Sequence, residues 1–250
     1  MTIKKGDFIE LDYTATLMED NAIFDTTQPE DAERAGMICN HDHDHNQHGH
    51  QHLTKDDFKP IIICVGEGHV LPGLDEQLEG LTIGEHDIIL GEENAFGKKD
   101  PKLLKLMTMN AFKKQKINPF PGLTVDMDGQ RGVVRSVSGG RIIVDFNHPL
   151  SGKAVKYSLS IKKKIDDKKE QIKSIMNLIR LPHESITIAN DEATIKIPME
   201  LPEHMFEGIK KDIERLTKTK ITFDIKKTEK DEKTIKNDEK SLNTTPDKKE

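Results

Sequence analysis

The stretch Val-Leu-Pro-Gly-Leu at residues 70–74 decides how the first part of this sequence is interpreted. Pro72 stands where a helix favours proline as its first residue, because the missing N–H would have no partner there in any case. Leu74, Leu78 and Leu81 follow at helical spacing, and Gly84 lies just beyond them. The stretch therefore predicts a short amphipathic helix that ends before Gly84.

A second motif, Asn-Ala-Phe-Gly at residues 94–97, predicts a glycine-bearing loop with an aromatic tip. Strand patterns surround both motifs. Residues 9–17 and 155–161 alternate apolar with polar side chains, residues 60–65 form a short β-branched apolar run, and residues 86–90 indicate one more strand. Several strands around one short helix are typical of an α+β fold.

The texture of the sequence changes between residues 98 and 148. Apolar side chains of the kind found on exposed binding surfaces crowd into its first part: Leu103, Leu104, Leu106, Met107, Met109, Phe112 and Phe120. Methionines such as Met107 and Met109 are more often core residues, although their flexible thioethers also suit a promiscuous binding surface. A hairpin is predicted next, with Val133–Val137 before the Ser-Gly-Gly turn at 138–140 and residues 142–144 after it. The run Asn-His-Pro-Leu-Ser-Gly-Lys at 147–153 then leads back into the last strand.

Residues 167–226 predict a separate module of helix, two strands, helix and strand. Helical stripes are formed by Ile172, Ile175, Met176 and Ile179, and by Met205, Ile209, Ile213 and Leu216. Residues 227–250 contain almost no aliphatic side chains, so burial cannot offset the entropy of ordering them, and we expect a disordered tail.

Composition excludes several classes of function. A net charge of −6 disfavours a nucleic-acid binder, which usually presents a basic face. The two cysteines, Cys39 and Cys64, have no metal-binding or redox spacing. The first residues lack the apolar core of a signal peptide, and no apolar run reaches the roughly 18 residues of a membrane span. We therefore expect a cytoplasmic protein without membrane or nucleic-acid partners.

The order of these motifs resembles the FKBP-type peptidyl-prolyl cis-trans isomerases, in particular the SlyD-like branch with an insert-in-flap domain and its long archaeal type. The resemblance implies a half-barrel of antiparallel strands around a short helix, formed by residues 1–97 and 149–163. It also implies a β-rich chaperone domain at 98–148 and a small C-terminal α+β domain at 167–226. Tyr13, Phe24, Val70, Leu71, Leu74 and Tyr157 fall where the family has pocket walls, and Asp25 where it has a hydrogen-bonding acid.

Two departures from the family pattern change what we expect of this pocket. Phe96 stands where a tyrosine hydroxyl commonly binds a substrate carbonyl, and Leu74 replaces the tryptophan floor of many members. We expect isomerase activity to survive and do not expect tight macrolide binding. Taken singly, Tyr13 and Tyr157 also fit ordinary core aromatics, and Asp25 also fits a turn cap.

The reaction itself needs no covalent chemistry and no cofactor. Rotation about a peptide bond faces a barrier of about 18–20 kcal/mol. An apolar pocket solvates the charge-separated planar amide poorly, so it favours the twisted transition state. Fixed hydrogen bonds to the substrate carbonyls add to this preference, which is differential binding of the transition state.

Histidines concentrate in one loop. His41, His43, His45, His48, His50 and His52 are six of the eleven histidines in the chain. Alternate residues of an extended segment share a face, so several imidazoles can converge on Ni²⁺, Zn²⁺ or Cu²⁺. A polar loop without a metal is the alternative interpretation.

Three hypotheses therefore remain open at this point. The leading one is an isomerase whose insert captures unfolded or proline-containing polypeptides. A holdase chaperone with a vestigial pocket is favoured by the missing hydroxyl at Phe96, and a metal-handling protein by the histidine loop. A homodimer through the C-terminal domain is a further open alternative.

Overall fold

The computed structural model describes residues 1–38, 53–127, 129–190, 192–198 and 203–225. These residues form two compact units. The first contains residues 1–5, 10–61 and 65–163, and the second contains residues 6–9 and 62–64 with the chain from Lys164 onward. Each unit mixes strands with a few helices, and most strand pairs are antiparallel, which fits an FKBP fold.

A five-stranded sheet lies mostly in the first unit, and its residues 8–9, 62–64 and 164 belong to the second. Strands β1 (Phe8–Leu17), β2 (Ile23–Thr26), β9 (Val155–Lys164) and β4 (Gly84–Leu90) follow the order β2-β1-β9-β4, and β3 (Ile61–Cys64) also pairs with β1. Apolar side chains at alternate positions of β9, including Val155, Leu159 and Ile161, are buried. Helix α1 (Pro29–Arg34) follows β2, and the single-turn helix η1 (Lys55–Asp57) precedes β3.

Helix α2 (Pro72–Leu78) begins at the predicted proline but is shorter than the leucine spacing predicts. Glu79 is already extended and Gly80 has a φ of +91°, so the chain leaves the helix before Leu81. Backbone hydrogen bonds explain the early end, because Gly80 N–H donates to the Ile3 carbonyl and Ile3 N–H donates to the Leu81 carbonyl. The prediction that the helix extends through Leu81 is therefore wrong, and Gly84 begins strand β4.

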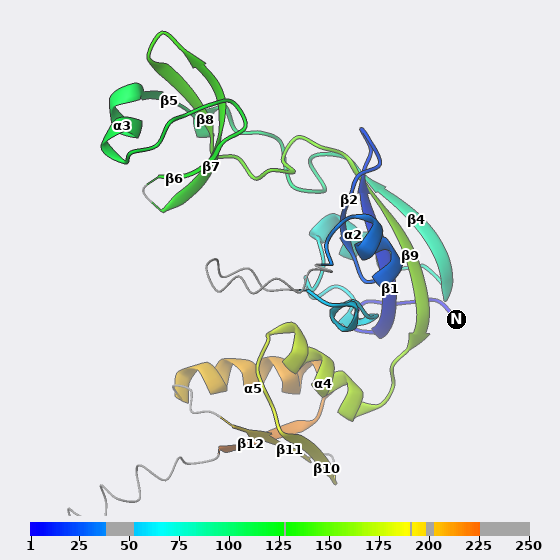
Figure 1. Ribbon diagram of the computed structural model, residues 1–250. Coiled ribbons are helices and arrows are strands. Elements are labelled where there is room, and N and C mark those ends of the chain that lie inside the picture. Colours follow the sequence, from blue (N-terminus) through cyan, green and yellow to red (C-terminus); the bar gives the residue numbers. More distant parts are fainter. Residues whose placement is uncertain (39–52, 128, 191, 199–202, 226–250) are drawn as a thin grey trace, which may run out of the picture. The chain divides into compact units, whose positions relative to one another are not determined.

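A second sheet lies within the first unit, between β4 and β9 in sequence (Figure 1). Its order is β5-β8-β7-β6, formed by β5 (Leu104–Thr108), β8 (Arg141–Asp145), β7 (Gln130–Ser138) and β6 (Thr124–Met127). Helix η2 (Pro101–Leu103) precedes it, and α3 (Met109–Lys114) follows β5. The predicted hairpin is confirmed, because β7 and β8 pair antiparallel around Gly139-Gly140.

The insert has its own apolar core, which changes one expectation. Phe112 was expected on an exposed binding surface, but its side chain is fully buried among Val125, Met127, Val134, Ile142 and Val144. Met107 and Met109 pack against the same core. A few apolar side chains of the insert do stay exposed, namely Leu104, Leu106, Phe120 and Ile143.

The second unit contains helix α4 (Lys168–Leu178), strands β10 (Ser185–Ala189) and β11 (Glu192–Ile197), helix α5 (Glu203–Thr217) and strand β12 (Lys220–Ile225). Strand β11 pairs antiparallel with β10 and parallel with β12. Its core joins Ile172, Met176, Ile195, Ile213 and Ile221 with Phe8 and Cys64. Ile179 and Met205, expected on the buried stripes, are 45% and 46% exposed. Ile179 is the C-cap of α4, and Phe206 is the buried side chain at the start of α5.

Candidate active site: an aromatic cluster beside a carboxylate

Three strands bring aromatic side chains into one cluster. Tyr13 lies on β1, Phe24 on β2 and Tyr157 on β9, and β1 is the strand between β2 and β9 in the sheet. The ring centroids of Tyr13 and Tyr157 are 5.8 Å apart, and those of Phe24 and Tyr157 are 6.2 Å apart at 90°. Phe96 extends the cluster from the loop after β4, 5.7 Å from Phe24 in an edge-on arrangement. These geometries are those that aromatic pairs favour.

The carboxylate of Asp25 lies next to this cluster. The Tyr13 hydroxyl donates to Asp25 Oδ2 at 2.8 Å. Desolvation by the surrounding residues raises the pKa of Asp25, against hydrogen bonds from Tyr13 and from the Thr26 backbone that lower it. Burial, and then the charge of Asp25, raise the pKa of both Tyr13 and Tyr157. Both tyrosines therefore keep their hydroxyl protons at neutral pH.

Threonines hold β2 in position against β1. The hydroxyls of Thr14 and Thr26 lie 2.9 Å apart, and Thr26 also donates to the Tyr13 carbonyl. The Thr27 hydroxyl accepts the Tyr13 N–H at 2.9 Å and donates to Asp12 at 2.7 Å. Thr26 and Thr27 directly follow Asp25 in the chain, so these contacts help to position the carboxylate relative to the Tyr13 ring.

The start of α2 and the loop that carries Phe96 approach each other closely. A side chain at Gly73 would place its Cβ 2.2 Å from the Asn94 carbonyl oxygen, so only glycine fits there. The buried Asp75 carboxylate accepts the N–H groups of Gly66 and Gly68, both at 2.8 Å, and so fixes the turn before the helix. The two sequence motifs at 70–74 and 94–97 therefore lie against each other at Gly73 and Asn94.

The chain entering the insert is joined to the chain leaving it. The Ser151 hydroxyl donates to the Phe96 carbonyl at 3.1 Å, and Gly152 N–H donates to the Gly97 carbonyl at 2.8 Å. The His148 ring stacks on the Phe96 ring, with centroids 4.9 Å apart and planes 6° apart. Phe96 is therefore held from the side of the insert as well as from the cluster.

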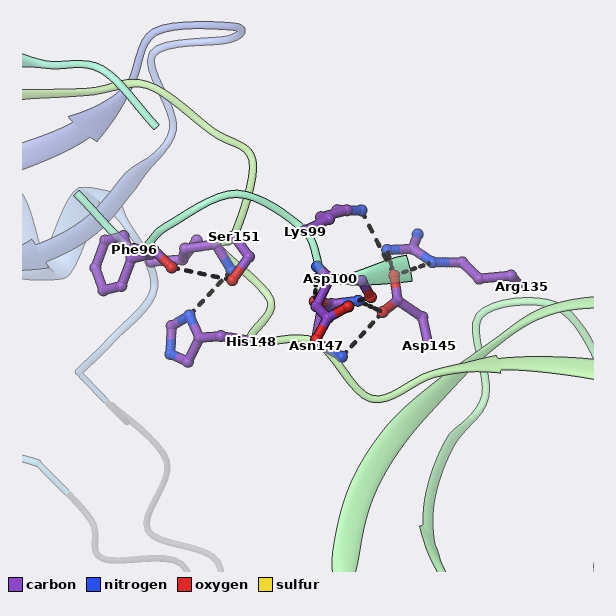
Figure 2. A network of polar contacts seen from close by, with 9 residues as sticks. Phe96, Lys99, Asp100, Arg135, Asp145, Asn147, His148 and Ser151 are labelled. Carbon is purple, nitrogen blue, oxygen red and sulfur yellow. Dashed lines mark hydrogen bonds and ion pairs between the residues drawn. The ribbon is translucent and has the colours of Figure 1, made fainter. Parts of the chain in front are cut away.

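A polar network joins the chain entering the insert to the chain leaving it, with Arg135 of β7 added. We call this network the linker clasp: Lys99, Asp100, Arg135, Asp145 and Asn147 (Figure 2). Asp145 is only 4% exposed and accepts hydrogen bonds from Arg135 and from both the backbone N–H and the side-chain amide of Asn147. The Asn147 side chain also bonds both backbone groups of Asp100. Burial would raise the pKa of Asp145, but these bonds and the Lys99 charge lower it to about 2.

The predicted pocket residues fall into two groups. The structure brings Tyr13, Phe24, Asp25, Phe96 and Tyr157 together, as described above. Val70 and Leu71 are half-buried immediately before α2, and Leu74 is 1% exposed within the helix. Gly73, between Leu71 and Leu74, ties their segment to the Phe96 loop.

The predicted metal ligands, His41 to His52, lie outside the residues that the structure describes. Within the described part of the chain, no group of three or more histidine, cysteine or acidic side chains is arranged to hold a metal ion. Among the helices described, none has the length and apolar character that a membrane crossing requires.

An exposed apolar face lies on the sheet of the insert. Leu106 is 65% exposed on β5, and its register partner Ile143 on β8 is 39% exposed. Leu104, two residues before Leu106 on the same side of β5, is 43% exposed. Strand β5 is an end strand of this sheet, so among the described residues the face is next to a free sheet edge. We call Leu104, Leu106 and Ile143 the insert face.

Comparison with known proteins identifies the family. Residues 105–150 match the family model described as the FKBP26 IF domain. The chain is 32% identical over 114 residues to the FKBP-type 16 kDa peptidyl-prolyl cis-trans isomerase of Escherichia coli, a match covering 43% of this chain and 76% of that protein. The chain therefore belongs to the FKBP-type peptidyl-prolyl cis-trans isomerases, and it is an enzyme of that class.

Further relatives indicate the branch of the family. The short-type peptidyl-prolyl cis-trans isomerase of Methanocaldococcus jannaschii is 25% identical over 161 residues, which are 64% of this chain and 92% of the relative. The FKBP-type isomerase SlyD of Aeromonas hydrophila is 31% identical over 107 residues, 42% of this chain and 50% of the relative. With the insert-domain match, these relatives support a SlyD-like member.

Sequence reasoning missed several residues of the site. It singled out the run at 147–153 as a junction but gave no role to His148, Ser151 or Asn147, and it passed over Asp145. The sequence does offer a signal for these residues. Many side chains of residues 145–153 can form hydrogen bonds, and this segment leads from the insert back to the main sheet.

Proposed function

We propose that this isomerase twists X-Pro bonds against the aromatic cluster of Tyr13, Phe24, Phe96 and Tyr157, with Asp25 as the polar group that orients the substrate. The observation that carries the proposal is the convergence of four rings from three strands and one loop around a hydrogen-bonded carboxylate. A proline ring is compact and apolar, so aromatic faces bury it well.

Rate enhancement then follows from environment and positioning. Apolar walls remove water from the X-Pro amide. This destabilises the planar, charge-separated form of the amide relative to the twisted form. The Tyr13 hydroxyl is bonded to Asp25, which keeps the carboxylate at one position and one orientation. A fixed polar group costs no reorganisation as the bond rotates, so it stabilises the transition state more than a solvated one would.

We assign capture of unfolded polypeptides to the insert face. Leu104, Leu106 and Ile143 present exposed aliphatic surface beside an unpaired sheet edge. An extended chain can add its backbone to such an edge while its apolar side chains cover the face. The histidine loop at 41–52 adds a second candidate function, reversible binding of Ni²⁺, Zn²⁺ or Cu²⁺, which rests on its six imidazoles. Catalysis requires no cofactor in this scheme.

A proline-limited refolding assay, run beside a tetrapeptide assay, tests the proposal. The wild type should accelerate both reactions at catalytic concentration. A variant in which a short loop replaces residues 98–146, and which leaves His148 in place against Phe96, should keep the tetrapeptide activity and lose most of the refolding activity. A holdase with a vestigial pocket would suppress aggregation of the unfolded protein but leave both slow reactions unchanged. Equal losses on both substrates would mean that the insert belongs to the scaffold of the pocket.

A further inference from the structure

We infer that His148 is a substrate-binding residue of this isomerase, and that its Nε2–H donates a hydrogen bond to a carbonyl of the bound peptide. The residue lies outside the strands that build the cluster, on the segment that returns from the insert. Its ring nevertheless stacks on Phe96 at 4.9 Å, so it extends the aromatic surface by one ring (Figure 2).

The hydrogen bonding of the ring decides which nitrogen faces the substrate. Leu150 N–H donates to His148 Nδ1 at 3.2 Å, so Nδ1 carries a lone pair and acts as the acceptor. A neutral imidazole has one protonated nitrogen, and the proton is therefore on Nε2. This bond also holds the plane of the ring parallel to Phe96. The donor is thus fixed in both tautomer and direction.

Two side-chain hydroxyls near Phe96 already donate to other groups. The Tyr13 hydroxyl donates to Asp25, and the Ser151 hydroxyl donates to the Phe96 carbonyl. Phe96 itself has no polar atom. His148 is exposed, and within the described residues no protein group bonds its Nε2. A peptide lying along the Phe24–Phe96–His148 rings would meet this N–H without displacing another partner.

A substrate peptide supplies the complementary group. The backbone carbonyls on either side of an X-Pro bond are hydrogen-bond acceptors, and proline itself supplies no N–H donor. A donor at a fixed position beside the apolar cluster can hold one of these carbonyls while the X-Pro bond rotates. The inference rests on the proposed pocket, and it adds one donor to it.

Three substitutions separate the hydrogen bond from the stacking and from the turn. His148→Asn keeps an acceptor at the position of Nδ1 and removes the distal donor. His148→Phe keeps a ring against Phe96 and removes both nitrogens. His148→Gln places an amide N–H near the position of Nε2 without a ring. His183→Asn, in the second unit, is the matched control. Tetrapeptide kcat/KM and thermal unfolding are measured for all four.

We expect His148→Asn and His148→Phe to lower kcat/KM by about three- to tenfold, the effect of one neutral hydrogen bond, and His148→Gln to recover part of the loss. The melting temperatures should remain near that of the control. Full activity in His148→Phe with loss in His148→Gln would overturn the inference in favour of a stacking role. Wild-type activity in His148→Asn would overturn it as well. An inactive wild type would instead refute the proposed pocket.

Discussion

Replacing Asp145 by asparagine should loosen the linker clasp by an amount that the structure predicts. The pKa of Asp145 is about 2 in the folded chain, against 3.8 for an ordinary aspartate. A pKa difference of one corresponds to about 1.4 kcal/mol, so the carboxylate charge contributes at most about 2–3 kcal/mol to the free energy of unfolding. Its partners Arg135 and Lys99 are 51% and 42% exposed, so solvent screens both ion pairs. We therefore expect a loss of about 1–2 kcal/mol.

The pH dependence gives this prediction its sharpest test. Because folding lowers the pKa of Asp145, the stabilisation is fully present above pH 3.8 and is lost as the pH falls through about 2. The difference between wild type and Asp145→Asn should therefore be complete at pH 7 and should shrink between about pH 4 and pH 2. An asparagine side chain can still accept from Asn147, so the substitution removes the charge with little change of shape.

Hydrogen–deuterium exchange of the amides in β7 and β8 measures the local effect, since these strands carry Arg135 and Asp145. Asp126→Asn is the matched control, because Asp126 is an exposed aspartate on β6 of the same sheet. We expect that control to change stability by less than about 0.5 kcal/mol. Equal exchange in the two variants at pH 7, or a difference that does not depend on pH, would refute the reasoning.

Four further predictions follow from single features of the chain. Tyr13→Phe should lower kcat/KM by about fivefold, which is the effect of losing one exposed hydrogen bond. It should also shift the acid limb of the pH profile to higher pH, because the Tyr13 hydroxyl lowers the pKa of Asp25, which burial raises. An acid limb at the same or a lower pH would contradict this. Leu106→Lys should weaken binding of an unfolded protein by a few-fold while tetrapeptide activity stays unchanged. Lys102→Leu is the control, since Lys102 is exposed and lies outside the insert face. Calorimetry with a reduced, unfolded substrate measures binding by the two variants. Gly73→Ala should displace the Phe96 loop, since its Cβ would lie 2.2 Å from the Asn94 carbonyl oxygen, and should cost about 1–3 kcal/mol in thermal unfolding together with activity; wild-type stability would show that the loop yields freely. Deleting residues 41–52 should abolish most Ni²⁺ or Zn²⁺ binding in calorimetry, and wild-type binding by the deletion variant would exclude the loop as the site.

Local sequence pattern determined the elements of this protein well. Alternation at residues 9–17 and 155–161 predicted β1 and β9, the proline at position 72 predicted the first residue of α2, and the glycine turn at 139–140 predicted the β7–β8 hairpin. Side-chain period and turn chemistry are properties of neighbouring residues, so a single sequence displays them. The order of the pocket motifs was likewise enough to indicate the family.

Tertiary structure alone decided the contacts between distant segments. The early end of α2 depends on Ile3, the position of the Phe96 loop on Gly73, and the low pKa of Asp145 on Arg135 and Lys99. The stacking of His148 on Phe96 joins residues separated by the whole insert. Such contacts depend on how the chain closes upon itself, and neither period nor propensity records that closure. The same physical reason explains Phe112, whose side chain is buried because the sheet of the insert folds over it.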